Sequence, residues 1–289
     1  MEQKNTTREK LWEEYSELVS EFAKNVKEMP TKGIPVPHIP IVGKDYDDCA
    51  YKMAFIGMET MEWPPQKTSK LTFKDDFPTF IDLIEKAPKE AITRYENWLN
   101  ENGMFEYRER SAYWLFIKHF LQKFYHVKNL KIKKGQYHAL MSSFVWGNAN
   151  AIERYEVTAK KKKVNKKVWE AVKEASKPFD NINHLIDATQ PKVIFITYKG
   201  VSKEYITTDN EVCSEKHIFS MPKGKEIAIR HYYLRNRDTH VFVTPHPTWM
   251  IRSKIGFKPY INALTKSIKE HNIWSQLPQS KEDWRIKEK

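Results

Sequence analysis

Four short apolar runs, set far apart along the chain, constrain most strongly how this sequence can fold. They cover residues 51–57, 137–146, 193–198 and 240–244. Runs of this length are typical of buried strands, and segments with helical periodicity, such as residues 164–176, separate them. Strands that alternate with helices favour a parallel sheet. We therefore expect an α/β fold, a three-layer αβα sandwich around a central, mainly parallel four-stranded sheet.

The segments around these runs predict additions to the sheet. Residues 6–29 place apolar side chains on one helical face, and the proline-rich stretch 30–40 has the composition of an extended linker. Helical periodicity over 77–124 indicates a helical insertion after the first strand. The predicted organisation is an N-terminal helix and linker (1–48), an α/β domain (49–275) with its insertion at about 64–130, and a charged C-terminal tail (276–289).

The charge balance of the chain favours a polyanionic partner. Its 289 residues carry a formal net charge of +12, and contacts of Lys and Arg with phosphate supply most non-specific affinity for nucleic acids. A basic surface that serves only solubility explains the same composition. Two cysteines, Cys49 and Cys213, are too few for a four-thiolate iron–sulfur cluster or a Cys-rich zinc site, and they fit a reducing compartment. No apolar run approaches the length of about 20 residues that spans a membrane, so we expect a soluble, cytoplasmic protein.

Polar side chains follow the predicted strands at the points where the strands end. The first run stops at Gly57 and reaches Glu59 two residues later. Asn148 follows the second run, and His246 follows the fourth. Because parallel strands end at one edge of a sheet, where α/β proteins bind ligands, we expect Glu59, Asn148 and His246 to converge. Each residue also has a purely structural explanation, since Glu59 suits a helix N-terminus and the other two suit turns.

A carboxylate, an amide and an imidazole around one pocket can hydrolyse a bond whose leaving group is a heterocyclic base. Cleavage of a base from deoxyribose passes through an oxocarbenium-like state, in which Glu59 can stabilise positive charge and orient water. His246 can donate to the departing base, and Asn148 can pair with a base edge through its donor and acceptor. The sequence contains no Gly-x-Ser-x-Gly elbow and no Gly-rich phosphate loop, which disfavours nucleophilic triads and phosphate-loop chemistry.

The motifs at these strand ends resemble those of the uracil-DNA glycosylase superfamily. Gly57-Met-Glu-Thr-Met61 is similar to the first motif of that superfamily, and His246-Pro-Thr248 is similar to its His-Pro-Ser motif. Residues 249–257 resemble its minor-groove intercalation loop, and Asn148 stands where the superfamily keeps a base-reading Asn. The resemblance covers about residues 50–270 in order and spacing. It implies a monomeric DNA glycosylase that flips its target base into a pocket and needs neither metal nor cofactor.

The resemblance also implies a role for each matching residue. Glu59 would position water, Asn148 would read the base and His246 would support the leaving base. The rest of the base pocket would consist of a stacking ring, Phe73, together with Met58 and Met61. The implied DNA contacts are Lys199, Thr248 and the residues of a wedge that would fill the vacated stack, Met250, Ile251 and Arg252.

Thr60 and Met61 depart from the pattern of the uracil-specific relatives. Those relatives keep Pro-Tyr at these two places, and the Tyr ring blocks substituents at the fifth carbon of the base. A flexible thioether is a poor gate, so we expect a pocket that accepts a 5-substituted pyrimidine. By this resemblance the nearest functional relatives are bacterial glycosylases that excise modified cytosines, such as glucosylated hydroxymethylcytosine, from phage DNA. The alternatives are a repair enzyme for uracil or another deaminated base, and a non-catalytic, base-sensing DNA-binding protein.

Overall fold

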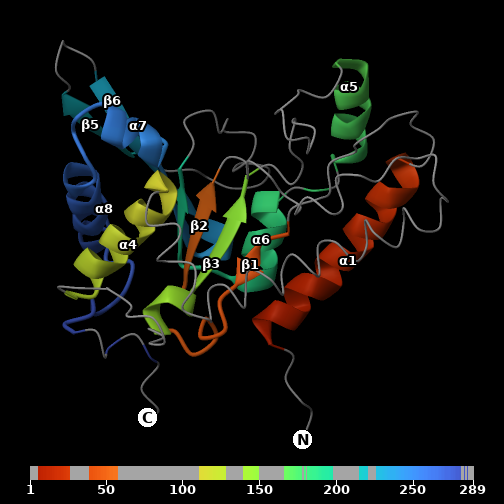
Figure 1. Cartoon of the computed structure of the whole chain (residues 1–289). Helices are drawn as coiled ribbons and strands as arrows, with labels where there is room; N and C mark the ends of the chain where they lie inside the picture. The colour runs from red at the N-terminus through yellow and green to blue at the C-terminus, as the bar shows by residue number, and fades with distance from the viewer. Residues whose placement is uncertain are drawn as a thin grey trace, which may run out of the picture. The chain divides into compact units, whose positions relative to one another are not determined.

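The structure of the protein, a computed structural model, combines helices with a mixed β-sheet (Figure 1). It describes residues 6–26, 39–57, 111–127, 139–149, 166–177, 179, 181–197, 215–220, 226–280, 283 and 285. The α/β class expected from the sequence is therefore confirmed. Within these ranges, no helix combines the length and the apolar character needed to pass through a membrane.

The sheet has the strand order β1-β3-β2-β4-β7-β6-β5. Its strands are β1 (Ile41–Val42), β2 (Met53–Gly57), β3 (Phe144–Asn148), β4 (Val193–Ile196), β5 (Glu215–Ser220), β6 (Glu226–Leu234) and β7 (Thr239–Val243). The α-helices are α1 (Thr7–Val26), α4 (Ala112–Phe124), α5 (Lys166–Ala175), α6 (Asn181–Thr189), α7 (Pro247–Arg252) and α8 (Lys258–Glu270). Two short 3-10 helices, η1 (Ala139–Ser142) and η4 (Arg235–Arg237), precede β3 and β7.

The chain divides into two compact units. One unit includes α1, α5 and α6, and the other includes α4, β2, β4 to β7, α7 and α8. The boundaries run through β1, between Ile41 and Val42, and through β3, between Trp146 and Gly147. The domain limits predicted at residues 48 and 275 stay predictions.

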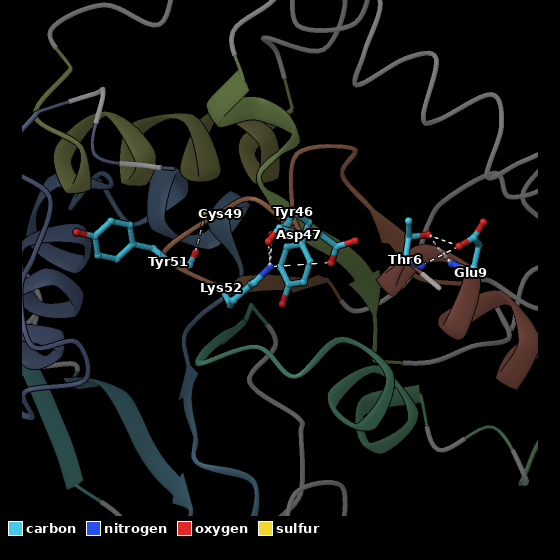
Figure 2. Close-up of polar contacts among 7 residues, drawn as sticks. All are labelled: Thr6, Glu9, Tyr46, Asp47, Cys49, Tyr51 and Lys52. Carbon is cyan, nitrogen blue, oxygen red and sulfur yellow. Dashed lines mark hydrogen bonds and ion pairs between the residues drawn. The ribbon is translucent and has the colours of Figure 1, made fainter. Parts of the chain in front are cut away.

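The first unit is built around the predicted N-terminal helix, which is confirmed as α1. Thr6 and Glu9 form a reciprocal capping box, since the Thr6 N–H donates to Glu9 at 2.7 Å and the Glu9 N–H donates to the Thr6 hydroxyl at 3.3 Å (Figure 2). One apolar face of α1 is buried, and its Tyr15 ring packs edge-on against His184 of α6 at 5.9 Å. His184 also pairs with Glu14. The amphipathic pattern of the sequence thus identified the packing face of this helix.

Three of the predicted strands, β2, β4 and β7, form the parallel part of the sheet. Ile56 of β2 lies opposite Ile196 of β4, which in turn lies opposite Val243 of β7. Every residue of these strands is buried. Strands covered on both faces need apolar side chains at successive positions, which is why these runs were continuous in the sequence rather than alternating.

The observed sheet differs from the predicted one in two respects. The sequence predicts a strand over 137–146, but Ala139–Ser142 forms a 3-10 helix and β3 begins only at Phe144, so the predicted strand start is wrong. Ala, Leu and Met favour helical geometry over strands, which explains the local difference. The sheet is also not a four-stranded parallel one, because β6 pairs antiparallel with β7 and β5 pairs antiparallel with β6. The expected parallel core is thus part of a larger mixed sheet.

Helix α4 packs an aromatic face against β2. Its Phe120 ring lies 5.8 Å from the ring of Phe55, measured between centroids. Tyr113, in the first turn, donates to the Phe55 carbonyl at 2.8 Å, whereas Phe124, the last residue, packs edge-on against Tyr51 at 5.4 Å. Since Tyr51 precedes β2, α4 runs antiparallel to this strand. The N-terminus of α4 therefore lies towards the end of β2 at which the Gly57 motif begins.

The turn before β2 is fixed by Lys52 (Figure 2). Its ammonium group donates to the carbonyls of Tyr46 and, at 2.8 Å, of Asp47, and lies 4.5 Å from the centroid of the Tyr46 ring. The Cys49 thiol donates to the Tyr51 carbonyl at 3.4 Å, and burial raises the pKa of this thiol. A buried, protonated thiol in such a turn is a packing group rather than a nucleophile.

Candidate functional site

The carboxyl ends of β2, β4 and β7 meet at one edge of the sheet. The Thr197 N–H, directly after β4, donates to the Ile56 carbonyl at 2.9 Å, and the Thr244 N–H, directly after β7, donates to the Ile196 carbonyl at 2.8 Å. The Thr197 hydroxyl adds a second contact with the Ile56 carbonyl at 3.2 Å. The backbone ladder therefore continues to the last residues of all three strands. Three of the four strand ends named in the sequence prediction lie side by side, as expected for parallel strands.

His246 stands at this edge, where β7 leads into α7. The residue caps α7: its Nδ1 atom accepts the N–H of Thr248 at 3.2 Å. Pro247 occupies the first helical position, where its missing N–H costs nothing and its fixed φ favours the helix. A backbone N–H can only donate, so Nδ1 carries a lone pair and the proton of the neutral ring resides on Nε2. The local sequence His-Pro-Thr thus fixes the tautomer of His246.

The surroundings of the His246 ring favour its neutral form. Burial lowers the pKa of the ring from its ordinary value, although the residue as a whole is exposed. A lowered pKa leaves the ring uncharged at neutral pH, with one N–H donor at Nε2. His246 can therefore donate a hydrogen bond to a ligand at the strand edge without carrying a charge.

The residues of α7 after the cap divide into buried and exposed groups. Met250 is fully buried, whereas Ile251 is 47% exposed and Arg252 is exposed. Met250 therefore has the burial of a core residue, which corrects its predicted place in a DNA-contacting wedge. Trp249 is 36% exposed and received no role in the sequence prediction. Its position between Thr248 and the predicted wedge residues is the feature of the sequence that points to a DNA contact. Ile251 and Trp249 are the large hydrophobic residues that the described part of the chain exposes.

Asn148 is the last residue of β3 and is 4% exposed. Its strand adjoins β2 in the sheet order. Gly147, the preceding residue, allows a close approach, because a Cβ atom there would lie 3.2 Å from Pro40 and 3.3 Å from Leu185. Asn148 and His246 belong to different compact units. Their predicted convergence stays a prediction.

The remaining predicted site residues lie outside the described part of the chain. They are Met58, Glu59, Met61, Phe73 and Lys199. The described segments end at Gly57, two residues before Glu59, and at Thr197, two residues before Lys199. The roles of these five residues stay predictions.

Tyr113, on α4, is a further polar group near the strand edge. Its hydroxyl donates to the Phe55 carbonyl at 2.8 Å, and burial raises the pKa of this phenol far above its ordinary value. The phenol is therefore a permanently protonated donor, and it contacts β2 two residues before the strand ends at Gly57. A hydroxyl on an otherwise apolar helix face was the signal that distinguishes Tyr113 from its aromatic neighbours.

Among the described residues, no group of His, Cys, Asp and Glu has an arrangement suited to holding a metal ion. Comparisons with protein-family models, curated proteins and solved structures find no match to this chain.

Proposed function

We propose that this chain is a monofunctional DNA glycosylase, which hydrolyses the N-glycosidic bond of a flipped base and leaves an abasic site. The observation that carries the proposal is the shared strand edge: β7 delivers the His246-Pro-Thr248 motif to the edge at which β2 ends in Gly57, the first residue of the Gly-Met-Glu-Thr-Met motif. The proposal includes the finer fold implied by the resemblance, a three-layer arrangement around a parallel core. The enzyme would act on DNA as a monomer in the cytoplasm.

The proposed reaction is a simple hydrolysis. Water forms a bond to C1′ of the deoxyribose while the bond from C1′ to the base nitrogen breaks, and the bonding electron pair leaves with the base. The Glu59 carboxylate orients the water, accepts its proton and stabilises the oxocarbenium-like transition state. The Nε2–H of His246 donates to the departing base, and a neutral donor suffices because the charge on the base is delocalised. Asn148 pairs with the base edge.

The exposed side of α7 supports a nucleic-acid partner. Trp249 and Ile251 are apolar and exposed, and the exposed cations Arg252, Lys254 and Lys258 follow within a few residues. Apolar wedges that enter a base stack are accompanied by cations that contact the flanking phosphates in proteins that unstack DNA. We therefore assign the wedge to Ile251, with Trp249 beside it and Arg252 as a phosphate contact.

The proposed substrate is a 5-substituted cytosine, for example the glucosylated hydroxymethylcytosine of phage DNA, which gives the enzyme a role in antiviral defence. The support is the sequence after β2, where Thr60 and Met61 stand in place of the Pro-Tyr that excludes such substituents in uracil-specific relatives. A methionine adapts its shape to a bulky neighbour. Uracil repair and base sensing without catalysis are the alternatives that the experiment must separate.

The decisive assay incubates the protein, without added metal, with oligonucleotides that contain one uracil, one hypoxanthine or one glucosylated hydroxymethylcytosine, in single-stranded and duplex form. Abasic sites are detected as alkali-labile breaks. Glu59→Gln should slow cleavage by at least about 100-fold. Glu21→Gln, the same change at an exposed position of α1, should cleave like the wild type.

Each outcome separates the proposal from an alternative. Equal activity of the wild type and Glu59→Gln on a cleaved substrate would overturn the catalytic assignment. Efficient cleavage of uracil but not of the bulky cytosine would indicate a repair enzyme instead. Tight binding to a modified base without any cleavage would indicate a base-sensing protein.

A further inference from the structure

Three histidines from separate elements of the second unit come together away from the candidate site. His231 lies on β6, His240 on β7, and His271 is the C-cap of α8. His231 and His240 are 2% and 8% exposed, and their ring planes are inclined by only 5° with centroids 5.2 Å apart. The His271 ring lies 4.2 Å from that of His231 and 6.2 Å from that of His240. We call these three residues the histidine cluster.

The two buried rings of the cluster share one hydrogen bond. Nε2 of His231 lies 3.0 Å from Nδ1 of His240, so one of these nitrogens carries a proton and the other a lone pair. One additional proton, taken up elsewhere on the pair, preserves this bond but places a full charge in a buried site. A second additional proton leaves each ring doubly protonated, so both facing nitrogens become donors and the bond is lost.

The surroundings of His240 offer little compensation for a positive charge. The charges that act on His240 are those of Lys192, Asp238 and His271. Asp238 is the single carboxylate among them, and it already pairs with Lys192 and accepts the Tyr233 hydroxyl at 2.9 Å. The Tyr233 ring itself stacks on His240 at 4.5 Å.

The faces of His231 are covered in a similar way. The Phe242 ring stacks on it at 4.6 Å, and His271 covers it from α8. On β5, Glu215 is its partner in the backbone register. Two aromatic rings and a third imidazole therefore cover the pair, and the burial of His240 favours the uncharged state of that ring.

We propose that the histidine cluster is an acid-sensitive latch, in which the neutral His240 ring, hydrogen-bonded to His231, helps to hold β6, β7 and the C-terminus of α8 together, and in which a charge on His240 at low pH weakens this packing. The pKa of His240 agrees with the geometry: burial, Lys192 and His271 lower it from 6.5 to about 4. Since the folded-state pKa is depressed, the unfolded chain binds more protons below pH 6.5. The stabilisation is then complete above pH 6.5 and is lost as the pH falls from there to about 4.

Urea unfolding at a series of pH values tests the latch. In the wild type, the equilibrium constant for unfolding should rise on the order of 100-fold between pH 7 and pH 4 through His240 alone. His240→Gln, which cannot be protonated, should remove this part of the pH dependence. His119→Gln, at an exposed histidine on α4, should retain it. Equal pH dependence in His240→Gln and the wild type would overturn the proposal.

Nitrogen NMR of the imidazole rings in the wild type provides a second test, which holds even where His240→Gln fails to fold. The signals of His231 and His240 should show one donor and one acceptor nitrogen in the shared bond, and the His240 ring should stay neutral at pH 5.5. Ordinary titration of His240 near pH 6.5, while the chain stays folded, would show that its charge does not weaken the packing and would refute the latch.

Discussion

The addition of one methyl group at Gly43 is a change for which the structure predicts a clear loss of stability. The residue follows β1 and is buried. A Cβ atom at Gly43 would lie 2.0 Å from the carbonyl oxygen of Ser142 and 2.8 Å from its Cα atom, whereas real Cβ atoms essentially never come within 3.0 Å of such atoms. Both contacts are with backbone, so no side chain can rotate away. In Gly43→Ala the two backbone segments must separate.

The loss of stability in Gly43→Ala follows from the hydrogen bonds that hold these segments together. The Gly43 N–H donates to the Phe144 carbonyl at 3.1 Å, the Asp45 N–H donates to the Ser142 carbonyl at 3.1 Å, and the Ser142 hydroxyl donates to the Asp45 carboxylate. At about 1 kcal/mol for each bond, their loss should lower the free energy of unfolding by about 3 kcal/mol. Urea titration followed by tryptophan fluorescence measures this difference.

Gly256→Ala is the matched control, because it adds the same methyl group at a glycine where the group meets no other atom. Gly256 has a φ of +74°, and a Cβ atom there would have nothing within 4 Å. Its substitution should therefore cost only the left-handed backbone conformation, about 1 kcal/mol. A free energy of unfolding for Gly43→Ala within about 0.5 kcal/mol of the wild type, as for surface substitutions, would refute the backbone clash, and so would an equal loss in both variants.

Four further substitutions test the core and the candidate site. Phe195→Ala should lower the free energy of unfolding by about 3–5 kcal/mol in the same titration, because its ring is fully buried, and a loss below 1 kcal/mol would contradict the packing. Tyr113→Phe should cost about 1–3 kcal/mol, since the buried Phe55 carbonyl loses a donor; an unchanged midpoint would mean that another donor replaces it. Met250→Ala should cost about 2–5 kcal/mol, whereas Ile251→Ala should leave stability within about 0.5 kcal/mol and weaken DNA binding in fluorescence anisotropy. The reverse order of the two stabilities would contradict the placement of α7.

The sequence predicted the strands whose complete burial requires an unbroken run of apolar residues. β2, β4 and β7 are buried along their whole length, so apolar residues run without interruption. β5 and β6 were not predicted. Their sequences, EKHIFS and EIAIRHYYL, mix charged and apolar residues, as is typical of antiparallel strands with unequal faces. An unbroken apolar run distinguishes a strand more clearly than an irregular alternation does.

For the candidate site, the sequence predicted where strands end but not which side chains are buried. The Pro-His-Pro sequence after β7 required a break in the strand, and the structure places the α7 cap there. Met250 and Ile251 are adjacent in the sequence and similarly apolar, yet one is buried and the other exposed. A helix of six residues is too short for apolar periodicity to define its inner face. Only the packing of α7 against the rest of its unit separates the two residues.

The histidine cluster shows why some groups of neighbouring side chains cannot be predicted from sequence patterns. His231 is opposite Phe242 and Tyr233 is opposite His240 in the antiparallel register, so the two histidines are diagonal neighbours across β6 and β7. A shift of this register by one residue would move one histidine to the other face and remove the shared hydrogen bond. The register depends on the short connection through η4 and on Asp238, whose φ of +48° closes the turn. A non-glycine residue in that conformation is uncommon, and its carboxylate pairs with Lys192 and Tyr233 beside the cluster. The turn that sets the register therefore also supplies a carboxylate that acts on His240. Asp238→Gly should keep the turn while making the cluster more sensitive to acid.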